Sequence, residues 1–521
     1  MDDWRPINYD VSLSFDDKLS EITKARTIIS VLILKDAVTR LDFDFGEMNV
    51  DSVTVGDAPA RYERSAGTLS VTLPQAAKDG ERLSVSISYH GKPKDGLALT
   101  ADKDGKPSAT GDNWPNRAHH WIPCLDHPSA KATVNFTVTA PARDVVIANG
   151  KREATRDNAD ATRTWSYTES VPIPPYCMIV SIGEGALFEP KTNAPTPLIY
   201  YVPQRDRDYA VQGFASSSDT LNFFTQMVAP YPYEKLALIV GATRFGGMEN
   251  SSAIVFASTL FDKRDASPKM SARYHIPGGV ENVVAHEIAH QWFGDAVTEK
   301  TWADLWLSEG FATYFAGLFV EHFEGEQVFR DYMKGEADGY FKYEQTRRAP
   351  IHDTETEDLF KLLNANNYNK GAWVLHMLHS MLGDKDFFQG IRAYYAAHRN
   401  STATTEDLRA ALEKSSDTNL REFFARWVYG SGHPRYDVAW NWKEAKKKKG
   451  VLTITVRQTQ DGELFPNPMP IEIVSADGTQ RVLMKAKKKE TILRVPLQHK
   501  PTEVRFDPDG TILKEVNLRP A

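Results

Sequence analysis

The hydrophobic pattern of this chain changes its period twice. From residue 1 to about residue 191, apolar and polar residues alternate in short runs, separated by clusters of Gly, Asp, Asn and Pro. Such alternation is typical of antiparallel strands with one buried face. Residues 192–433 carry long patterns with the helical period, and alternation returns in residues 434–521. The sequence therefore predicts a β region, a mainly helical region and a second, smaller β region.

The predicted fold class is a multidomain α+β protein. With 521 residues the chain exceeds what one hydrophobic core usually holds, so a division into domains is expected. A proline-rich segment without periodicity, residues 189–197, marks the first boundary. In the last region, Asp477-Gly478 predicts a hairpin turn. The predicted domains are residues 1–191, 192–433 and 434–521.

Charge and hydropathy exclude some classes of partner. The chain has 62 basic and 69 acidic residues and no broad basic region, so nucleic acid is not an expected partner. Short lysine runs at 446–449 and 487–489 are expected to be solvated hairpin tips. No apolar stretch is long enough to span a bilayer. We expect a soluble protein, cytoplasmic, or periplasmic or secreted if a leader has been removed.

A five-residue motif in the helical region carries the strongest indication of chemistry. His286 and His290 are four residues apart in a helical pattern, so both imidazoles project from one face and can reach one ion. Catalytic zinc takes three protein ligands and keeps an open position for water. Glu309, on a second helical segment, is the candidate third ligand. Glu287 is placed to take a proton from the bound water.

The alternative is that these side chains only decorate an amphipathic helix. A chance match to the five-residue motif has odds of roughly a few per cent in a chain of this length. A third carboxylate at matching distance, also on a helix, lowers those odds greatly. We therefore predict one zinc ion per chain, held by His286, His290 and Glu309.

Beyond this motif, most of the chain resembles the aminopeptidase N family of gluzincin metallopeptidases. The resemblance rests on Gly246-Gly247-Met248-Glu249-Asn250 before the zinc helix and on Tyr368-Asn369-Lys370-Gly371 after it. Segments 121–134, 230–236 and 423–434 also follow the order of the family. The resemblance implies a thermolysin-like catalytic domain and a C-terminal β-sandwich.

The resemblance also implies a role for the segment before the zinc helix. In the family, the glutamate that matches Glu249 binds the α-ammonium of the substrate. Gly246 and Gly247 would let the substrate backbone approach and pair with the segment as an added strand. Met248 is expected to form a wall of the first specificity pocket. With Asn250, these residues make the predicted substrate-binding segment.

Tyr368 matches the family tyrosine whose hydroxyl donates to the oxyanion of the tetrahedral intermediate. Two departures from the family pattern accompany it. The N-domain region that supplies a second amine contact in many members reads Asp112-Asn113-Trp114 here. The leukotriene-hydrolysing branch has an Asp and a Tyr where this chain has Phe360 and Leu363, so epoxide hydrolysis is not supported.

The predicted function is a zinc-dependent aminopeptidase that removes one residue from the free amino end of a peptide. One alternative is an endopeptidase of the thermolysin type, which shares the zinc site and the water chemistry. Glu249 separates the two, since an endopeptidase gains nothing from an anion where the peptide chain must continue. The other alternative is a binding protein on a retained peptidase fold, which would not need the complete set of ligands, base and tyrosine.

Large members of the family carry a long helical domain that folds over the zinc cleft. Here strand patterns continue to Ala521. We therefore expect a three-domain protein with a cleft open on one side, or covered by a second subunit. The preferred residue, the oligomeric state, the compartment and the pairing of Cys124 with Cys177 are left open by the sequence.

Overall fold

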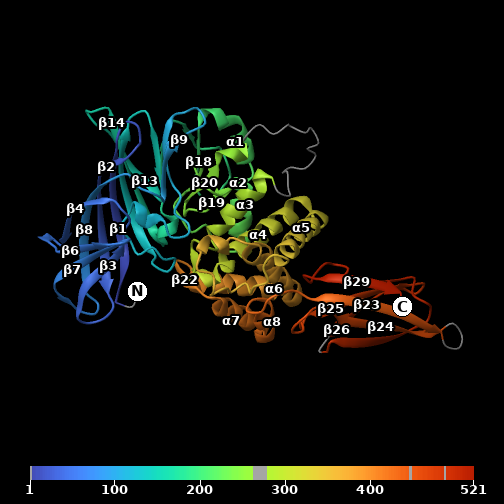
Figure 1. The fold of residues 1–521 in the computed structure, drawn as a ribbon. Coiled ribbons are helices and arrows are strands. Elements are labelled where there is room, and N and C mark those ends of the chain that lie inside the picture. The colour runs from blue at the N-terminus through green and yellow to red at the C-terminus, as the bar shows by residue number, and fades with distance from the viewer. Residues whose placement is uncertain (1–2, 262–278, 445–448, 486–487, 521) are drawn as a thin grey trace. The chain divides into compact units, whose positions relative to one another are not determined.

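The computed structural model describes residues 3–261, 279–444, 449–485 and 488–520 (Figure 1). They pack into two compact units. The first unit runs to Trp302 and includes residues 322–324 and 395–404, and the second holds the remainder. This division does not test the predicted domain boundaries, which stay predictions. Lys446 to Lys448 and Lys487, from the two lysine runs, lie outside the described residues.

An eight-stranded sheet organises the N-terminal part of the first unit, in the order β13-β14-β11-β1-β2-β8-β4-β5 (Figure 1). Its strands are β1 (Trp4–Phe15), β2 (Ile22–Ile33), β4 (Asn49–Val55), β5 (Ala58–Pro59), β8 (Arg82–Gly91), β11 (Ala132–Pro141), β13 (Lys151–Asp157) and β14 (Thr162–Ile173). The alternation along β1 buries Tyr9, Val11 and Leu13 in one core, as the period of two requires.

One pair of strands in this sheet differs from the predicted antiparallel arrangement. Strand β1 runs parallel to β11, with Asn8 opposite Thr133 and Ser14 opposite Thr139. Parallel neighbours need a long crossover connection, and the chain from β2 onward supplies it. The alternating pattern shows that a residue belongs to a strand, but it does not show the direction of the neighbouring strand.

Two smaller sheets complete this β region. Their orders are β3-β7-β6 and β12-β15-β10-β9. The strands are β3 (Val38–Asp44), β6 (Tyr62–Ser65), β7 (Thr68–Ala77), β9 (Leu97–Ala101), β10 (Pro107–Gly111), β12 (Val145–Ala148) and β15 (Val180–Gly183).

A mixed five-stranded sheet, in the order β16-β17-β18-β20-β19, follows. Its strands are β16 (Ala186–Phe188), β17 (Leu198–Val202), β18 (Leu236–Gly241), β19 (Gly247–Met248) and β20 (Ala253–Ala257). Strands β17, β18 and β20 are parallel, and β18 and β20 are apolar along almost their whole length, as strands covered on both faces are. Strand β19 pairs antiparallel with β20 at the edge, so the predicted substrate-binding segment lies at the border of the sheet.

Helices dominate the chain after this sheet begins. They are α1 (Arg207–Gly213), α2 (Ser217–Met227), α3 (Val280–His290), α4 (Trp306–Glu324), α5 (Glu326–Glu344), α6 (Gly371–His398), α7 (Thr405–Ser416) and α8 (Arg421–Trp427). Helix α4 is buried on all sides from Trp306 to Val320, which is typical of a central helix. Helix α6 is broken at Gly383, whose φ of 77° is not helical. A short parallel pair joins β21 (Val297–Glu299) to β22 (Ser401–Ala403).

The C-terminal residues form two sheets, in the orders β27-β24-β23-β29 and β26-β25-β28. Their strands are β23 (Arg435–Glu444), β24 (Gly450–Gln458), β25 (Pro468–Ser475), β26 (Gly478–Lys485), β27 (Glu490–Leu497), β28 (Glu503–Phe506) and β29 (Glu515–Pro520). The hairpin turn predicted at Asp477-Gly478 is confirmed, since Ser475 pairs with Gly478. The packing of the two sheets as a β-sandwich stays a prediction.

One prediction and one question that the sequence left open concern the whole chain. Within the described ranges, no helix combines the length and the apolar character that crossing a membrane requires. Cys124 and Cys177 are both buried and free. The thiol of Cys177 donates a hydrogen bond to Asp295 Oδ1 at 3.2 Å, so its partner is a carboxyl group rather than a second sulfur atom.

Candidate metal and substrate site

Helix α3 directs the two histidines of the five-residue motif, His286 and His290, toward one point. Their Nε2 atoms lie 3.0 Å apart. His290 Nδ1 lies 3.2 Å from the carbonyl oxygen of Phe293. Because a carbonyl oxygen can only accept, Nδ1 carries the proton and Nε2 presents its lone pair to His286. This is the tautomer that binds a metal through Nε2.

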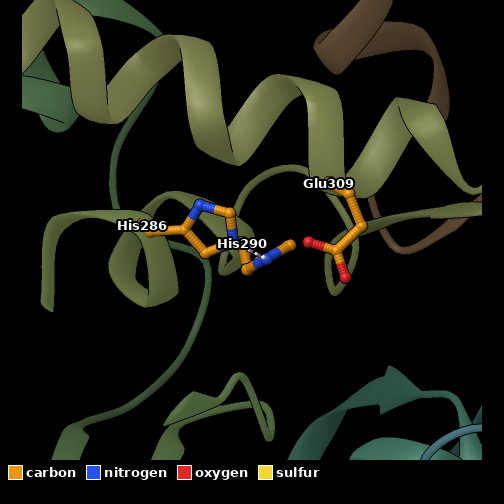
Figure 2. A group of neighbouring side chains, drawn as sticks. All are labelled: His286, His290 and Glu309. Carbon is orange, nitrogen blue, oxygen red and sulfur yellow. Dashed lines mark hydrogen bonds between the residues drawn. The ribbon is translucent and has the colours of Figure 1, made fainter. Parts of the chain in front are cut away.

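Glu309 on α4 completes a group of three (Figure 2). The candidate ligand atoms of His286, His290 and Glu309 all lie within 4.8 Å of one another. Two imidazoles and one carboxylate form a donor set that catalytic zinc uses, and two nitrogen ligands of one zinc ion lie about 3.3 Å apart when the bonds are tetrahedral. The residues present therefore fit a zinc ion.

A second group of side chains shares His290. Ligand atoms of Glu249, Glu287 and His290 also lie within 4.8 Å of one another. The exposed fractions of Glu249 and Glu287 are both 6%, and that of His290 is 1%. Two carboxyl groups are thus held in a buried position beside a candidate metal ligand. Carboxyl groups are buried in this way only where a cation or hydrogen-bond donors offset the loss of hydration.

Strand β19 runs against the side chain of Glu287. A methyl group at Gly247 would lie 2.3 Å from Glu287 Oε1 and 2.4 Å from Cδ. Any larger residue at this position must therefore displace the carboxyl group of Glu287. At Gly246, a methyl group would meet no described atom within 4 Å beyond its chain neighbours. The two glycines, for which the sequence predicts the same role, have different surroundings.

We expect Gly247→Ala to lower kcat between about 10- and 100-fold, because the added methyl group displaces the Glu287 carboxyl group and a shift near 1 Å can cost that much. The melting temperature should change little, since the side chain of Glu287 is flexible. Gly335→Ala, in α5, is the control, because a methyl group there meets no described atom within 4 Å outside its own helix, and this variant should keep the activity of the wild type. Steady-state kinetics and thermal unfolding of both variants, with metal content measured, provide the test. Wild-type kcat in folded Gly247→Ala protein would contradict the packing argument.

The rest of the predicted substrate-binding segment is buried. Met248 is 1% exposed, and Asn250 is fully buried. The amide nitrogen of Asn250 donates to the Met248 carbonyl oxygen at 3.3 Å, while its Oδ1 atom has no partner among the described residues. Asn250 therefore supports the shape of the turn that carries Glu249.

Tyr368 lies on a π-helical turn, Asn366–Lys370, that leads into α6. Such turns are rare in proteins, and many of those that occur lie at functional sites. Next to it, α4 and α6 cross closely, since a methyl group at Gly310 would lie 2.9 Å from the Cα atom of Gly371. This crossing holds Glu309, the neighbour of Gly310, beside the turn that carries Tyr368. The final glycine of the Tyr-Asn-Lys-Gly segment thus has a packing role.

The segment Asp112-Asn113-Trp114, which stands where the family has its second amine contact, has structural partners. Asp112 Oδ2 is 2.9 Å from Arg117 Nη2. Asn113 is fully buried. The ring of Trp114 packs edge-on against Phe245, with 6.0 Å between centroids. These contacts give each of the three residues a role in packing.

Lys131 is a residue of this region that sequence reasoning missed. Its Nζ donates to the carbonyl oxygens of Asp295 and Ala296, at 2.6 and 3.0 Å, and to Thr298 Oγ1 at 3.0 Å. Burial lowers the pKa of Lys131 to about 8. The lysine holds the loop that follows the histidine helix. Its only signal in the sequence was its place within segment 121–134, which the family shares.

Comparison with known proteins supports the resemblance. The sequence profile of the Peptidase family M1 domain matches residues 213–427, and that of the Peptidase M1 N-terminal domain matches residues 5–177. The chain is 32% identical to "Probable aminopeptidase 2" of Sulfurisphaera tokodaii over 324 residues, which are 61% of this chain and 40% of that protein. It is 26% identical to "Tricorn protease-interacting factor F2" of Thermoplasma acidophilum over 91% of this chain and 59% of that protein.

A human protein is also among the relatives. "Glutamyl aminopeptidase" of Homo sapiens is 30% identical over 338 residues, which are 63% of this chain and 34% of that protein. In each of these three comparisons the chain spans less than two thirds of the length of its relative.

Proposed function

The chain belongs to peptidase family M1, and from this membership we propose that it is a zinc-dependent aminopeptidase that hydrolyses the first peptide bond of peptides with a free amino terminus. The predicted resemblance to the aminopeptidase N family is confirmed by the two family profiles, which together cover residues 5–177 and 213–427. We further propose a thermolysin-like arrangement for the helical region and a β-sandwich for the C-terminal sheets.

The metal is proposed to bind to His286, His290 and Glu309. Zinc, when bound there, acts as a Lewis acid toward the substrate carbonyl group and activates water. The support for this assignment is the convergence of three ligand atoms within 4.8 Å and the tautomer of His290 set by the carbonyl oxygen of Phe293.

Three further residues have proposed roles in the reaction. Glu287 takes a proton from the attacking water and passes it to the leaving nitrogen. Tyr368 donates its hydroxyl hydrogen to the carbonyl oxygen as that oxygen becomes negative. Glu249 pairs with the α-ammonium group of the substrate, which fixes the scissile bond one residue away.

The observation that carries the proposal is the position of Glu249. Glu249 is only 6% exposed, and its carboxyl group lies within 4.8 Å of the carboxyl group of Glu287 and a ring nitrogen of His290. A buried anion this close to the reacting groups disfavours a peptide chain that continues on its amino side. It suits a substrate that ends there with a positive charge.

We expect an aminoacyl p-nitroanilide to be hydrolysed at least about 10²-fold more efficiently than its N-acetylated form. Acetylation removes the cation that pairs with the buried Glu249 carboxylate, and loss of one partner of such a pair costs about 2–5 kcal/mol. The measurement is kcat/KM for the two substrates on zinc-loaded protein. An internally quenched peptide with both ends blocked serves as the control for endopeptidase activity. Efficient cleavage of the blocked substrates would move the assignment to an endopeptidase.

A further inference from the structure

We propose that Gln291 is a positioning residue for the amine-binding carboxylate: its side-chain amide fixes the Glu249 turn to the helix that carries the histidines. This inference rests on the proposed function and assigns a role to the residue that follows His290 directly. Gln291 contacts neither the substrate nor the metal in this proposal. It acts by setting the place of Glu249.

The amide group of Gln291 is fully buried, and both of its N–H donors and its carbonyl oxygen have partners. Nε2 donates to the carbonyl oxygen of Glu249 and to Asp295 Oδ2, each at 2.8 Å. Oε1 accepts from the backbone N–H of Ser252 at 2.8 Å, and the Tyr231 hydroxyl, whose single hydrogen also faces the Lys235 carbonyl oxygen at 3.1 Å, lies 2.9 Å from Oε1. Two of these four contacts hold the Glu249 turn, and two hold the amide itself.

The two bonds to the turn join one amide group to residues three apart in the chain. The side chain accepts from the N–H of Ser252 and donates to the carbonyl group of Glu249. The turn between them is closed by the N–H of Ala253, which donates to the carbonyl oxygen of Asn250 at 2.9 Å. Both hydrogen bonds come from one planar group, so Gln291 fixes the orientation of the turn as well as its distance from α3.

The turn contains a strained residue that needs such support. Ser252 has a φ of 61°, which lies in the left-handed region that residues other than glycine rarely adopt. Besides Gln291, the Ser252 hydroxyl donates to Glu169 Oε2 at 2.8 Å and Lys235 Nζ donates to the Ser252 carbonyl oxygen at 2.8 Å. The far side of the turn is thus anchored to the protein core, and Gln291 is its link to the histidine helix.

Asp295 holds the other N–H of the amide in place. Its carboxyl group also accepts from the Cys177 thiol at 3.2 Å, and its backbone N–H donates to the His290 carbonyl oxygen at 3.0 Å. The chain from His290 through Gln291 to Asp295 is therefore closed on itself by hydrogen bonds. The Gln291 amide has little freedom to rotate, and the position of Glu249 relative to His290 follows from it.

Replacement of Gln291 by Glu keeps the shape and removes both N–H donors. The new carboxyl group would face the Glu249 carbonyl oxygen, which cannot donate to it. The turn should then lose its fixed place. The affinity for the α-ammonium group should fall, because it depends on where the Glu249 carboxylate lies.

We expect Gln291→Glu to raise KM for an aminoacyl p-nitroanilide at least about tenfold, with a smaller fall in kcat. The preference for this substrate over its N-acetylated form should fall by a similar factor. A merely structural loss of folded protein lowers kcat/KM for both substrates alike and leaves this ratio unchanged. Zinc content per chain should remain that of the wild type.

The control is the same substitution at a second buried glutamine. Gln458, in β24, is 1% exposed, and its side chain also pairs with a backbone, donating to the Phe465 carbonyl oxygen at 3.0 Å and accepting from the Phe465 N–H at 2.9 Å. Gln458→Glu should reduce thermal stability while leaving KM and the substrate ratio unchanged.

Gln291→Asn, which keeps the amide and shortens its reach by one methylene, should shift KM and the substrate ratio in the same direction as Gln291→Glu.

Wild-type KM and substrate preference in either folded Gln291 variant would overturn the inference. Equal losses on free and acetylated substrates would also overturn it, since that result assigns Gln291 to stability alone. Failure of the proposed function is distinguishable, because it would appear in the wild-type protein as the absence of any preference for the free amine.

Discussion

Glu287→Gln is expected to lower kcat by at least ~10²-fold, within the range that general acid and base catalysis contributes. The amide cannot take the proton that the carboxylate takes, yet its size and shape are the same. KM and zinc content should stay close to those of the wild type, because Glu287 is not among the three candidate ligands. The measurements are steady-state kinetics on an aminoacyl p-nitroanilide and metal analysis of the purified protein.

Glu281→Gln provides the matched control for this substitution. Glu281 lies in the first turn of the same helix, α3, nearly two turns before Glu287. The control variant should keep the kcat of the wild type. Loss of zinc from Glu287→Gln would show that Glu287 is needed for metal binding rather than for proton transfer, and an unchanged kcat would remove it from the mechanism.

Tyr368→Phe should cost about 2.7–4 kcal/mol of transition-state stabilisation, which corresponds to a fall in kcat of about 10²–10³. The hydroxyl is proposed to donate to an oxygen that carries negative charge only during the reaction. KM should therefore change little. The variant keeps the aromatic ring, so the π-helical turn at Asn366–Lys370 and the crossing of α4 with α6 should remain intact.

Tyr343→Phe is the control for the loss of a hydroxyl in the same unit. Tyr343 lies near the end of α5 and is half-buried, like Tyr368. It should have wild-type kinetics. A rise in KM without a fall in kcat for Tyr368→Phe would make Tyr368 a binding residue and not a donor to the oxyanion.

Local geometry explains why much of the candidate site could be predicted from the sequence. Two histidines four residues apart project from one face of any helix, because the helix repeats every 3.6 residues. The same short-range rule predicted that Glu309 lies on a helix, and α4 contains it. The alternation of residues before 191 and after 434 predicted strands in the same way.

Contacts between distant segments could not be predicted in this way. The parallel pairing of β1 with β11 depends on which strands meet, and each strand has the same alternation whatever the direction of its neighbour. The close contact at Gly247 is with Glu287, forty residues later, and does not follow from the backbone conformation. Lys131 gave no sign in the sequence that it is buried against the loop after α3.

The sequence by itself determined the residue types and their local faces: two histidines on one side of α3, a carboxylate on α4, and a glycine-rich segment before them. Only the tertiary structure decided that Gly247 packs on Glu287 and that the amide of Gln291 joins the Glu249 turn to the histidine helix. The physical reason is the distance along the chain over which each effect acts. Helix and strand periods act over a few residues, whereas a buried hydrogen bond is selected by whichever distant groups the folded chain leaves to be paired.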